Sequence, residues 1–175
     1  MKKMLAFSGS MSQESINHQL VEFAVNSIDK AEVKIIRLAD YAAPIYSAEQ
    51  EKEGIPEGIA RLRNEFDQAD AFILSTPEYN GSIPGGLKNT MDWLSRTEGT
   101  TFQDKPVLLM STSPGARGGA TVLNHLAAII PYWGAKLIGP FSLPSFHQNL
   151  VNNEMNAELK AGLDKNLTEL LEAIS

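Results

Sequence analysis

Hydroxyl side chains are concentrated in one short stretch near the start of the chain. Four serines lie within eight residues, and an asparagine follows closely: Ser8, Ser10, Ser12, Ser15 and Asn17. The stretch separates a short apolar run from a segment whose apolar residues have helical spacing, so free amides at the start of that helix favour an anion. Because no Lys or Arg occurs between Met4 and Asp29, the pattern indicates either a single monophosphate held by neutral donors or a serine-rich helix cap and turn.

Two common nucleotide-binding loops are excluded by the spacing of the glycines. The first loop lacks the G-x-G-x-x-G fingerprint of dinucleotide sites, and no Lys follows its glycine as in a Walker loop. Neutral donors also argue against a nucleoside triphosphate with its magnesium ion. A terminal monophosphate is the ligand that this loop fits best.

A second polar loop lies between Ala69 and Ser95. The apolar run Ala71–Leu74 is typical of a buried strand, and Pro77 prevents it from continuing. Asn80-Gly81 readily adopts positive φ, and Pro84 suits the first turn of a helix. The helix that follows has its apolar residues at helical spacing: Leu87, Met91 and Leu94. Open α/β sheets bind ligands in such loops, so this loop is a candidate site.

These loops require a particular set of elements to position them. Five short apolar runs predict strands: Met4–Phe7, Val33–Leu38, Ala71–Leu74, Pro106–Ser111 and Ala135–Ile138. Helical spacing predicts helices over Ile16–Ile28 with Ser15 as N-cap, over Glu57–Asp67, after Pro84, up to about Ile130, and from Met155 to Ile174. Residues 39–56 should form a long connection, with the polar run Ser47–Gly54 solvated, and residues 140–153 an irregular segment.

The alternation of strands and helices predicts the fold class. No two strands are joined by a turn of hairpin length, so the strands should run parallel with right-handed crossovers. We therefore expect one α/β domain over residues 1–175: a doubly wound five-stranded parallel sheet with helices on both faces. Two strand orders are common for sheets of this kind, and each places its ligand where the order reverses.

The composition of the chain argues against several classes of partner and binding site. The net charge of -6 and the absence of a Lys/Arg cluster argue against nucleic acid or an anionic membrane as a partner. The chain has no cysteine, which fits a reducing compartment, and no stretch long enough to cross a membrane, so we expect a cytoplasmic protein. No metal site is expected, because the three histidines lack the spacing of metal ligands: His18, His125 and His147.

Three stretches together resemble one family. GSMSQESINHQL resembles the family's phosphate loop G-S-x-R-x-x-S-x-N-x-x-L. TPEYNGSIPGGLKNTMDWLS is very close to its signature T-P-E-Y-N-x-S-x-P-G-x-L-K-N-x-x-D-W, and SPGARGGA resembles its S-P-G-x-x-G-G loop. Over residues 4 to about 138 the chain is similar to the NADPH-dependent FMN reductases of flavodoxin-like fold, which include quinone, chromate and azo-dye reductases.

The resemblance implies a non-covalent FMN and its contacts. The phosphate would lie near Ser10, Ser12, Ser15 and Asn17. The ribityl chain and one edge of the isoalloxazine ring would be lined by residues of the second loop: Pro77, Glu78, Tyr79, Asn80 and Gly81. The ring would be flanked by residues of the third loop: Ser113, Pro114 and Gly115. Such a ring needs glycine and proline turns, and amides at its pyrimidine edge stabilise the charge of the reduced flavin.

The resemblance also implies an activity. NADPH or NADH would pass a hydride to FMN, and a quinone, free flavin or similar small acceptor would then enter the same cleft in a ping-pong mechanism. No side chain need act as an obligatory acid or base, so we assign no catalytic residue. Family members are usually homodimers or homotetramers, and we expect the Tyr79 loop and the helix that carries Trp93 at the subunit contact.

One departure from the family pattern affects the phosphate. The family usually has Arg where this chain has Ser12, and Glu14 adds a negative charge nearby. Losing one charge-assisted hydrogen bond would weaken phosphate binding by about 1.5 to 3 kcal/mol.

Several alternatives stay open. The protein could instead be an FMN-binding electron carrier or regulatory flavoprotein without nicotinamide turnover, or a flavin-free relative that binds another phosphate ligand. Cations after the ligand loops favour the reductase: Lys88, Arg96 and Arg117. Arg117 would contact the nicotinamide nucleotide or be solvated, Tyr79 would contact the ring or a second subunit, and Lys88 with Asp92 suggests a surface ion pair.

Overall fold

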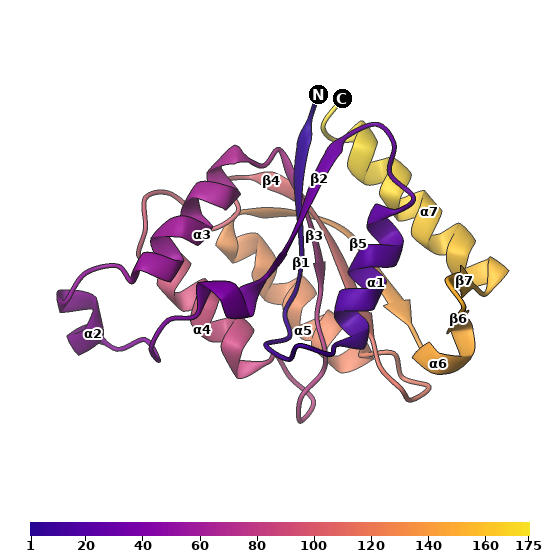
Figure 1. The fold of residues 1–175 in the computed structure, drawn as a ribbon, viewed down its shortest axis with the longest axis horizontal. Coiled ribbons are helices and arrows are strands. Elements are labelled where there is room, and N and C mark those ends of the chain that lie inside the picture. The colour runs from indigo at the N-terminus through magenta and orange to yellow at the C-terminus, as the bar shows by residue number, and fades with distance from the viewer.

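Five parallel strands form the centre of the computed structural model, which describes residues 1–175 (Figure 1). The strands are β1 Lys3–Ser8, β2 Glu32–Arg37, β3 Ala71–Ser75, β4 Lys105–Thr112 and β5 Ala135–Leu143. Their order in the sheet is β2-β1-β3-β4-β5, with every pair parallel. The chain moves outward from β1 to β2 and then returns past β1 to β3, so the order reverses at β1. This is the flavodoxin-like order, which confirms the predicted fold class.

Helices cover both faces of the sheet, as predicted. Helices α1 (Ile16–Val25) and α7 (Ala157–Glu172) lie on one face, and α3 (Glu57–Gln68), α4 (Gly85–Leu94) and α5 (Ala120–Ile129) on the other (Figure 1). Successive residues of β1 alternate between the two cores: Met4 and Ala6 pack with α1, whereas Leu5 and Phe7 pack with α3 and α4. Because both faces are covered, the central strands are almost entirely apolar.

Most elements begin or end within two residues of their predicted bounds, and the larger differences lie in α1, in the long connection and after residue 138. Helix α1 ends at Val25 rather than at the predicted Ile28. The amides of Ser27 and Ile28 donate to the carbonyls three residues earlier, and not four as in an α-helix. The long connection contains a 3-10 helix, Leu38–Tyr41, and the short helix α2, Ala48–Lys52. No residue of α2 is buried, as expected for the polar run.

The prediction that residues 140–153 are irregular is wrong. Strand β5 continues through Pro140 to Leu143, with a shift in register between Leu108 and Met110 of β4. An edge strand tolerates proline because one side of it needs no hydrogen-bonded partner. Helix α6 (Phe146–Asn149) follows, and a small hairpin of β6 (Leu150–Val151) and β7 (Glu154–Met155) leads into α7.

An aromatic cluster holds α3 against the sheet. The ring of Phe66 lies 4.8 Å from that of Phe72 and 5.6 Å from those of Phe7 and Phe102, measured between centroids. All four side chains are completely buried. Helix α3 belongs to the crossover from β2 to β3, which creates the reversal of strand order. Phe66 therefore stabilises the packing of this crossover on the sheet.

Replacing Phe66 with Ala should lower the free energy of unfolding by about 3 to 5 kcal/mol, because it removes a buried ring and leaves a cavity. Urea denaturation followed by circular dichroism measures the loss. The exposed neighbour Asn64 is a matched control on the same helix, and Asn64→Ala should change stability by less than about 0.5 kcal/mol. A loss below about 1 kcal/mol for Phe66→Ala would contradict the role of the cluster.

Candidate functional site

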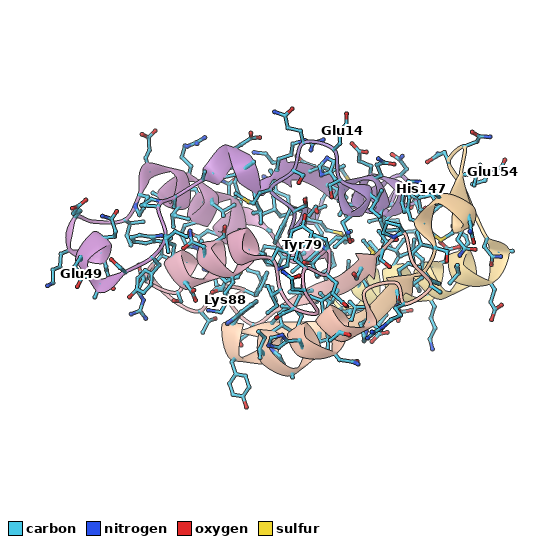
Figure 2. All side chains as sticks on the ribbon, turned by 90° about the horizontal axis from the view of Figure 1, so that it is seen from below. Glu14, Glu49, Tyr79, Lys88, His147 and Glu154 are labelled. Atoms are coloured by element: carbon cyan, nitrogen blue, oxygen red, sulfur yellow. The ribbon has the colours of Figure 1, made fainter.

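Three polar loops meet at the carboxyl edge of the sheet. They follow β1, β3 and β4 and comprise residues 9–15, 76–84 and 113–119. Ser8 at the end of β1 pairs with Ser75 at the end of β3, so the first two loops begin side by side. Figure 2 views this edge, with Tyr79 near the centre and Glu14 and Lys88 on either side of it. The structure thus brings together the three stretches that the sequence indicated.

The first loop is shaped by close packing at its base. The Gly9 amide donates to the carbonyl of Ser75 at 2.8 Å. A Cβ at Gly9 would lie 2.8 Å from both Leu87 Cδ2 and Thr76 Oγ1, so only glycine allows the loop to approach the start of α4. Ser10 is buried, and its Oγ accepts a hydrogen bond from the Ser12 amide at 3.2 Å. Ser15 is the N-cap of α1 as predicted, accepting from the His18 amide at 3.3 Å.

Several donors of the first loop are free. The backbone amides from Gln13 to Asn17 donate no hydrogen bond within the chain. The Ser12 side chain is exposed, and the Ser15 hydroxyl can still donate while its oxygen accepts. Five unpaired amides at the start of a helix, with two hydroxyls beside them, form a set of donors suited to an anion.

The side chain of Asn17 holds the base of the first loop. Its side chain is 1% exposed, and its Oδ1 accepts from Ser75 Oγ at 2.8 Å and from the Thr112 amide at 3.1 Å. Its Nδ2 donates to the Thr112 carbonyl at 3.1 Å. The side chain therefore ties the start of α1 to the ends of β3 and β4 and positions the loop.

The second loop contains a tight turn. The amide and carbonyl of Tyr79 exchange hydrogen bonds with those of Ser82, at 3.1 and 3.0 Å. Between them Asn80 and Gly81 have φ of 51° and 74°, as the Asn-Gly pair predicted. The turn projects Tyr79 from the surface, where 48% of the residue is exposed.

Two side chains anchor the second loop to α5. Glu78 Oε2 accepts from the amides of Thr121 at 3.0 Å and Val122 at 3.1 Å, in the first turn of that helix. Ser82 Oγ lies 3.0 Å from His125 Nδ1. The sequence analysis missed both anchors, since nothing in the sequence places residues 43 apart in contact. Glu78 Oε2 is occupied by these two amides, so the carboxylate is held against the start of α5.

The third loop is fixed to the segment after β5. The Gly115 carbonyl accepts from the Ser145 amide at 2.9 Å, and the Ser113 carbonyl accepts from the Phe146 amide at 3.0 Å. Pro114 and Gly115 are exposed between these contacts. A Cβ at Gly115 would meet nothing within 4 Å, so the surface above this residue is open. Arg117 is also exposed and donates to the hydroxyl of Thr121.

Helix α4, which follows the second loop, contains an ion pair on its surface and a buried tryptophan. Lys88 and Asp92 form the predicted surface ion pair, with 2.6 Å between Nζ and Oδ1. The Trp93 side chain faces the core: it is fully buried, and its indole Nε1 donates to the Pro44 carbonyl at 2.7 Å, so any subunit contact of this helix would use its exposed face. Pro44 and Tyr46 of the connection before α2 contact the Trp93 side chain, and the sequence pattern did not predict these contacts.

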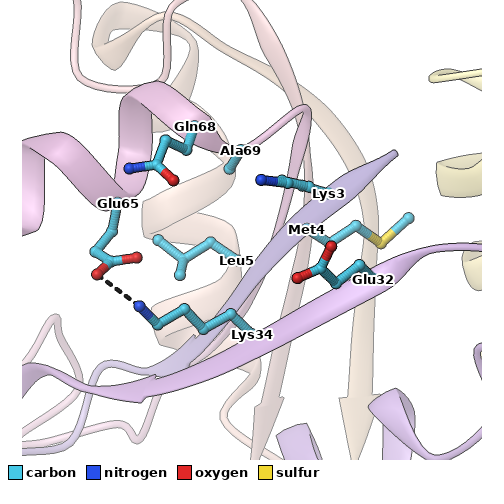
Figure 3. Close-up of a pocket in the computed structure, with 8 residues that line it drawn as sticks. All are labelled: Lys3, Met4, Leu5, Glu32, Lys34, Glu65, Gln68 and Ala69. Atoms are coloured by element: carbon cyan, nitrogen blue, oxygen red, sulfur yellow. Dashed lines mark hydrogen bonds and ion pairs between the residues drawn. The ribbon is translucent and has the colours of Figure 1, made fainter. Parts of the chain in front are cut away.

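A separate cavity of about 190 Å³ lies toward the amino ends of β1 and β2 (Figure 3). Lys3, Glu32 and Lys34 line one side of it, and residues near the end of α3 line the other. The Lys34 ammonium is already paired with Glu65 at 2.6 Å. Because the three loops lie at the carboxyl edge, this cavity is not part of their site. The structure has no group of three or more potential ligands placed to hold a metal ion, and none of its helices has the length and apolar character needed to cross a membrane.

These features define a flavodoxin-like protein whose three loops present free amide donors and an open surface at the carboxyl edge of the sheet. The free amides of the first loop suit a phosphate, and the surface over Gly81 and Gly115, where a Cβ would meet nothing within 4 Å, leaves room for a ring against the backbone. The profile of the family described as NADPH-dependent FMN reductase matches residues 2–148, and the chain belongs to this family. It is an NAD(P)H-dependent oxidoreductase whose cofactor is FMN.

Individual relatives agree with the family. The chain is 33% identical to a quinone reductase of Escherichia coli K12 over 165 residues, which cover 93% of this chain and 86% of that protein. It is 30% identical to an NAD(P)H-dependent FMN reductase of Pseudomonas aeruginosa, covering 97% of this chain and 89% of the relative. Among solved structures, the flavoenzyme NAD(P)H:(acceptor) oxidoreductase FerB of Paracoccus denitrificans aligns with a TM-score of 0.81 at 25% identity, covering 99% of each chain.

The role of Asn17 can be tested by Asn17→Ala, which should lower the free energy of unfolding by about 2 to 3 kcal/mol. The substitution leaves the buried groups of Ser75 and Thr112 without a partner. Urea denaturation gives the loss, and the exposed Asn26→Ala at the other end of α1 serves as a control with little expected effect. Equal stability of the two variants would contradict the role of Asn17.

The anchoring of the second loop can be tested by Glu78→Ala. The variant should lose about 1 to 2 kcal/mol of stability, because two amides at the positive end of α5 lose a carboxylate. Thermal denaturation of this variant is compared with that of Glu98→Ala, which removes an exposed carboxylate elsewhere. Native-state hydrogen exchange at Thr121 and Val122 should rise only in Glu78→Ala, and unchanged exchange there would be evidence against the contact.

Proposed function

We propose that this enzyme binds FMN on its three loops and transfers electrons from NADPH or NADH to a quinone or similar small acceptor by a ping-pong mechanism. The observation that carries this proposal is the set of unpaired amides from Gln13 to Asn17, next to an open surface between the second and third loops. Membership of the FMN reductase family and similarity to proteins named quinone reductase support the same assignment.

The first loop would hold the phosphate. Ser12 and Ser15 would donate their hydroxyls, and the amides from Gln13 to Asn17 would donate along the start of α1. Ser10 would act by ordering the loop through its bond to the Ser12 amide. Asn17 would contribute its backbone amide, since its side chain is engaged with β3 and β4.

The second and third loops would hold the ring and ribityl chain. When bound, FMN supplies the hydride chemistry. We assign five residues of the second loop to one edge of the cofactor: Pro77, Glu78, Tyr79, Asn80 and Gly81. Ser113, Pro114 and Gly115 would flank the ring from the third loop. Glu78 acts through its backbone because α5 occupies its carboxylate. Loops anchored in this way orient their amides before the cofactor arrives.

Donor and acceptor would use the same open surface in turn. Arg117 is exposed in the third loop and has no acidic partner, so its guanidinium would attract the phosphates of the nicotinamide nucleotide. Lys88 is paired with Asp92 and therefore contributes less. We assign no side chain as an obligatory acid or base.

Assembly into a homodimer or homotetramer is part of the proposal. Tyr79 stands half exposed beside the site, and an aromatic side chain in this position suits either the cofactor ring or a second subunit. The Tyr79 loop and the exposed face of the helix that carries Trp93 are the surfaces that we assign to the contact.

The test is an absorption spectrum of the purified protein, recorded before and after addition of FMN and then of NADPH without oxygen. We expect a flavin spectrum that bleaches on addition of NADPH, and parallel double-reciprocal plots when a quinone is varied. A flavin spectrum that does not bleach would contradict the reductase and favour an electron carrier. A colourless protein whose spectrum does not respond to FMN would rule out both.

A further inference from the structure

Arg37 reaches the first loop from the neighbouring strand. It is the last residue of β2 and pairs with Ser8, the last residue of β1. Its Nη1 donates to the carbonyl of Gln13 at 2.8 Å. The contact joins residues 24 apart in sequence, and it exists because β2 lies beside β1 in the sheet.

This guanidinium is a cation beside a loop that has none. Residues 4–29 contain no Lys or Arg, and Glu14 places a carboxylate on the same loop. Arg37 forms no ion pair within 4 Å, although His18, Glu22 and Asp40 line the shallow groove in which it lies. A guanidinium has five N–H donors, and only one of them is used here.

The charge of Arg37 affects the pKa of His18 in the first turn of α1. Burial lowers the pKa of His18, the nearby guanidinium of Arg37 lowers it further, and Glu22 opposes both effects. His18 is thus kept neutral at pH 7 and does not supply the positive charge itself. Arg37 is a cation in direct contact with this loop, through the Gln13 carbonyl.

We infer that Arg37 is a phosphate-positioning residue: it orders the first loop through Gln13 and supplies the positive charge that attracts the 5′-phosphate of FMN. This inference rests on the proposed function, because it requires the phosphate to lie in the first loop. It also explains how the loop tolerates Ser12 and Glu14. The positive charge comes from a residue of the adjacent strand β2, and not from the first loop itself.

The test measures the affinity of the apoprotein for FMN and for riboflavin, which lacks the phosphate, by quenching of flavin fluorescence. Arg37→Gln should weaken FMN binding by about tenfold to a hundredfold, as expected for one charge-assisted hydrogen bond. Its affinity for riboflavin should stay within about twofold, since riboflavin makes no phosphate contact. Thermal denaturation verifies that the variant is folded.

Three further variants separate charge from other effects. Arg37→Lys keeps the charge and should retain FMN affinity within about threefold. Arg61→Gln is the matched control, because Arg61 also donates to a backbone carbonyl, that of Asp40, at 2.8 Å but lies away from the first loop. It should bind FMN like the wild type. The double variant Arg37→Gln with Ser12→Arg should recover FMN affinity, because it restores a cation from within the loop.

The outcomes distinguish this inference from the proposed function. A wild-type protein that binds neither flavin would overturn the proposed function and this inference with it. Wild-type binding of FMN with equal affinity in Arg37→Gln would overturn the role of Arg37 alone. Equal weakening of FMN and riboflavin, or a loss in Arg37→Lys as large as in Arg37→Gln, would show that Arg37 acts through structure and not through charge.

Discussion

The hydrogen bonds of the Asn17 side chain are the contact on which the candidate site depends. One buried amide bonds to the end of β3 and twice to the end of β4, so the start of α1 cannot move independently of the two central strands. Each polar atom in this contact has a partner, which makes it favourable in a dry interior where an unpaired group would be costly. The first, second and third loops therefore share one fixed base.

The chain uses side chains to hold its loops and leaves backbone groups free for the ligand. Asn17, Glu78 and Ser82 are all engaged with other elements. In contrast, the amides from Gln13 to Asn17 donate to nothing within the chain. Such a division suits a cofactor that carries the reactive chemistry itself, because the protein has only to position it and stabilise its charge. Loops ordered in advance also reduce the entropy lost on binding.

Charge at this site comes from tertiary structure. The chain has a net charge of -6, and its first loop contains a glutamate and no cation. In the role inferred above, Arg37 would compensate, because parallel pairing sets the last residue of β2 opposite the last residue of β1. An anion in the first loop would then meet a helix terminus, free amides and one guanidinium. The guanidinium would contribute most at low ionic strength, since it is only partly buried.

The sequence by itself determined the class of fold and the three loops, because each rests on local pattern: apolar runs and helical spacing are set by burial, and Asn80-Gly81 and Ser15 act within a few residues. Tertiary structure alone decided the strand order, the continuation of β5 through Pro140 at a sheet edge, and the burial of Trp93. It also decided what Asn17, Glu78 and Arg37 do, since their partners are 24 to 95 residues away. Hydrogen-bond partners at such separations are chosen by the packing of the sheet, which periodicity does not encode.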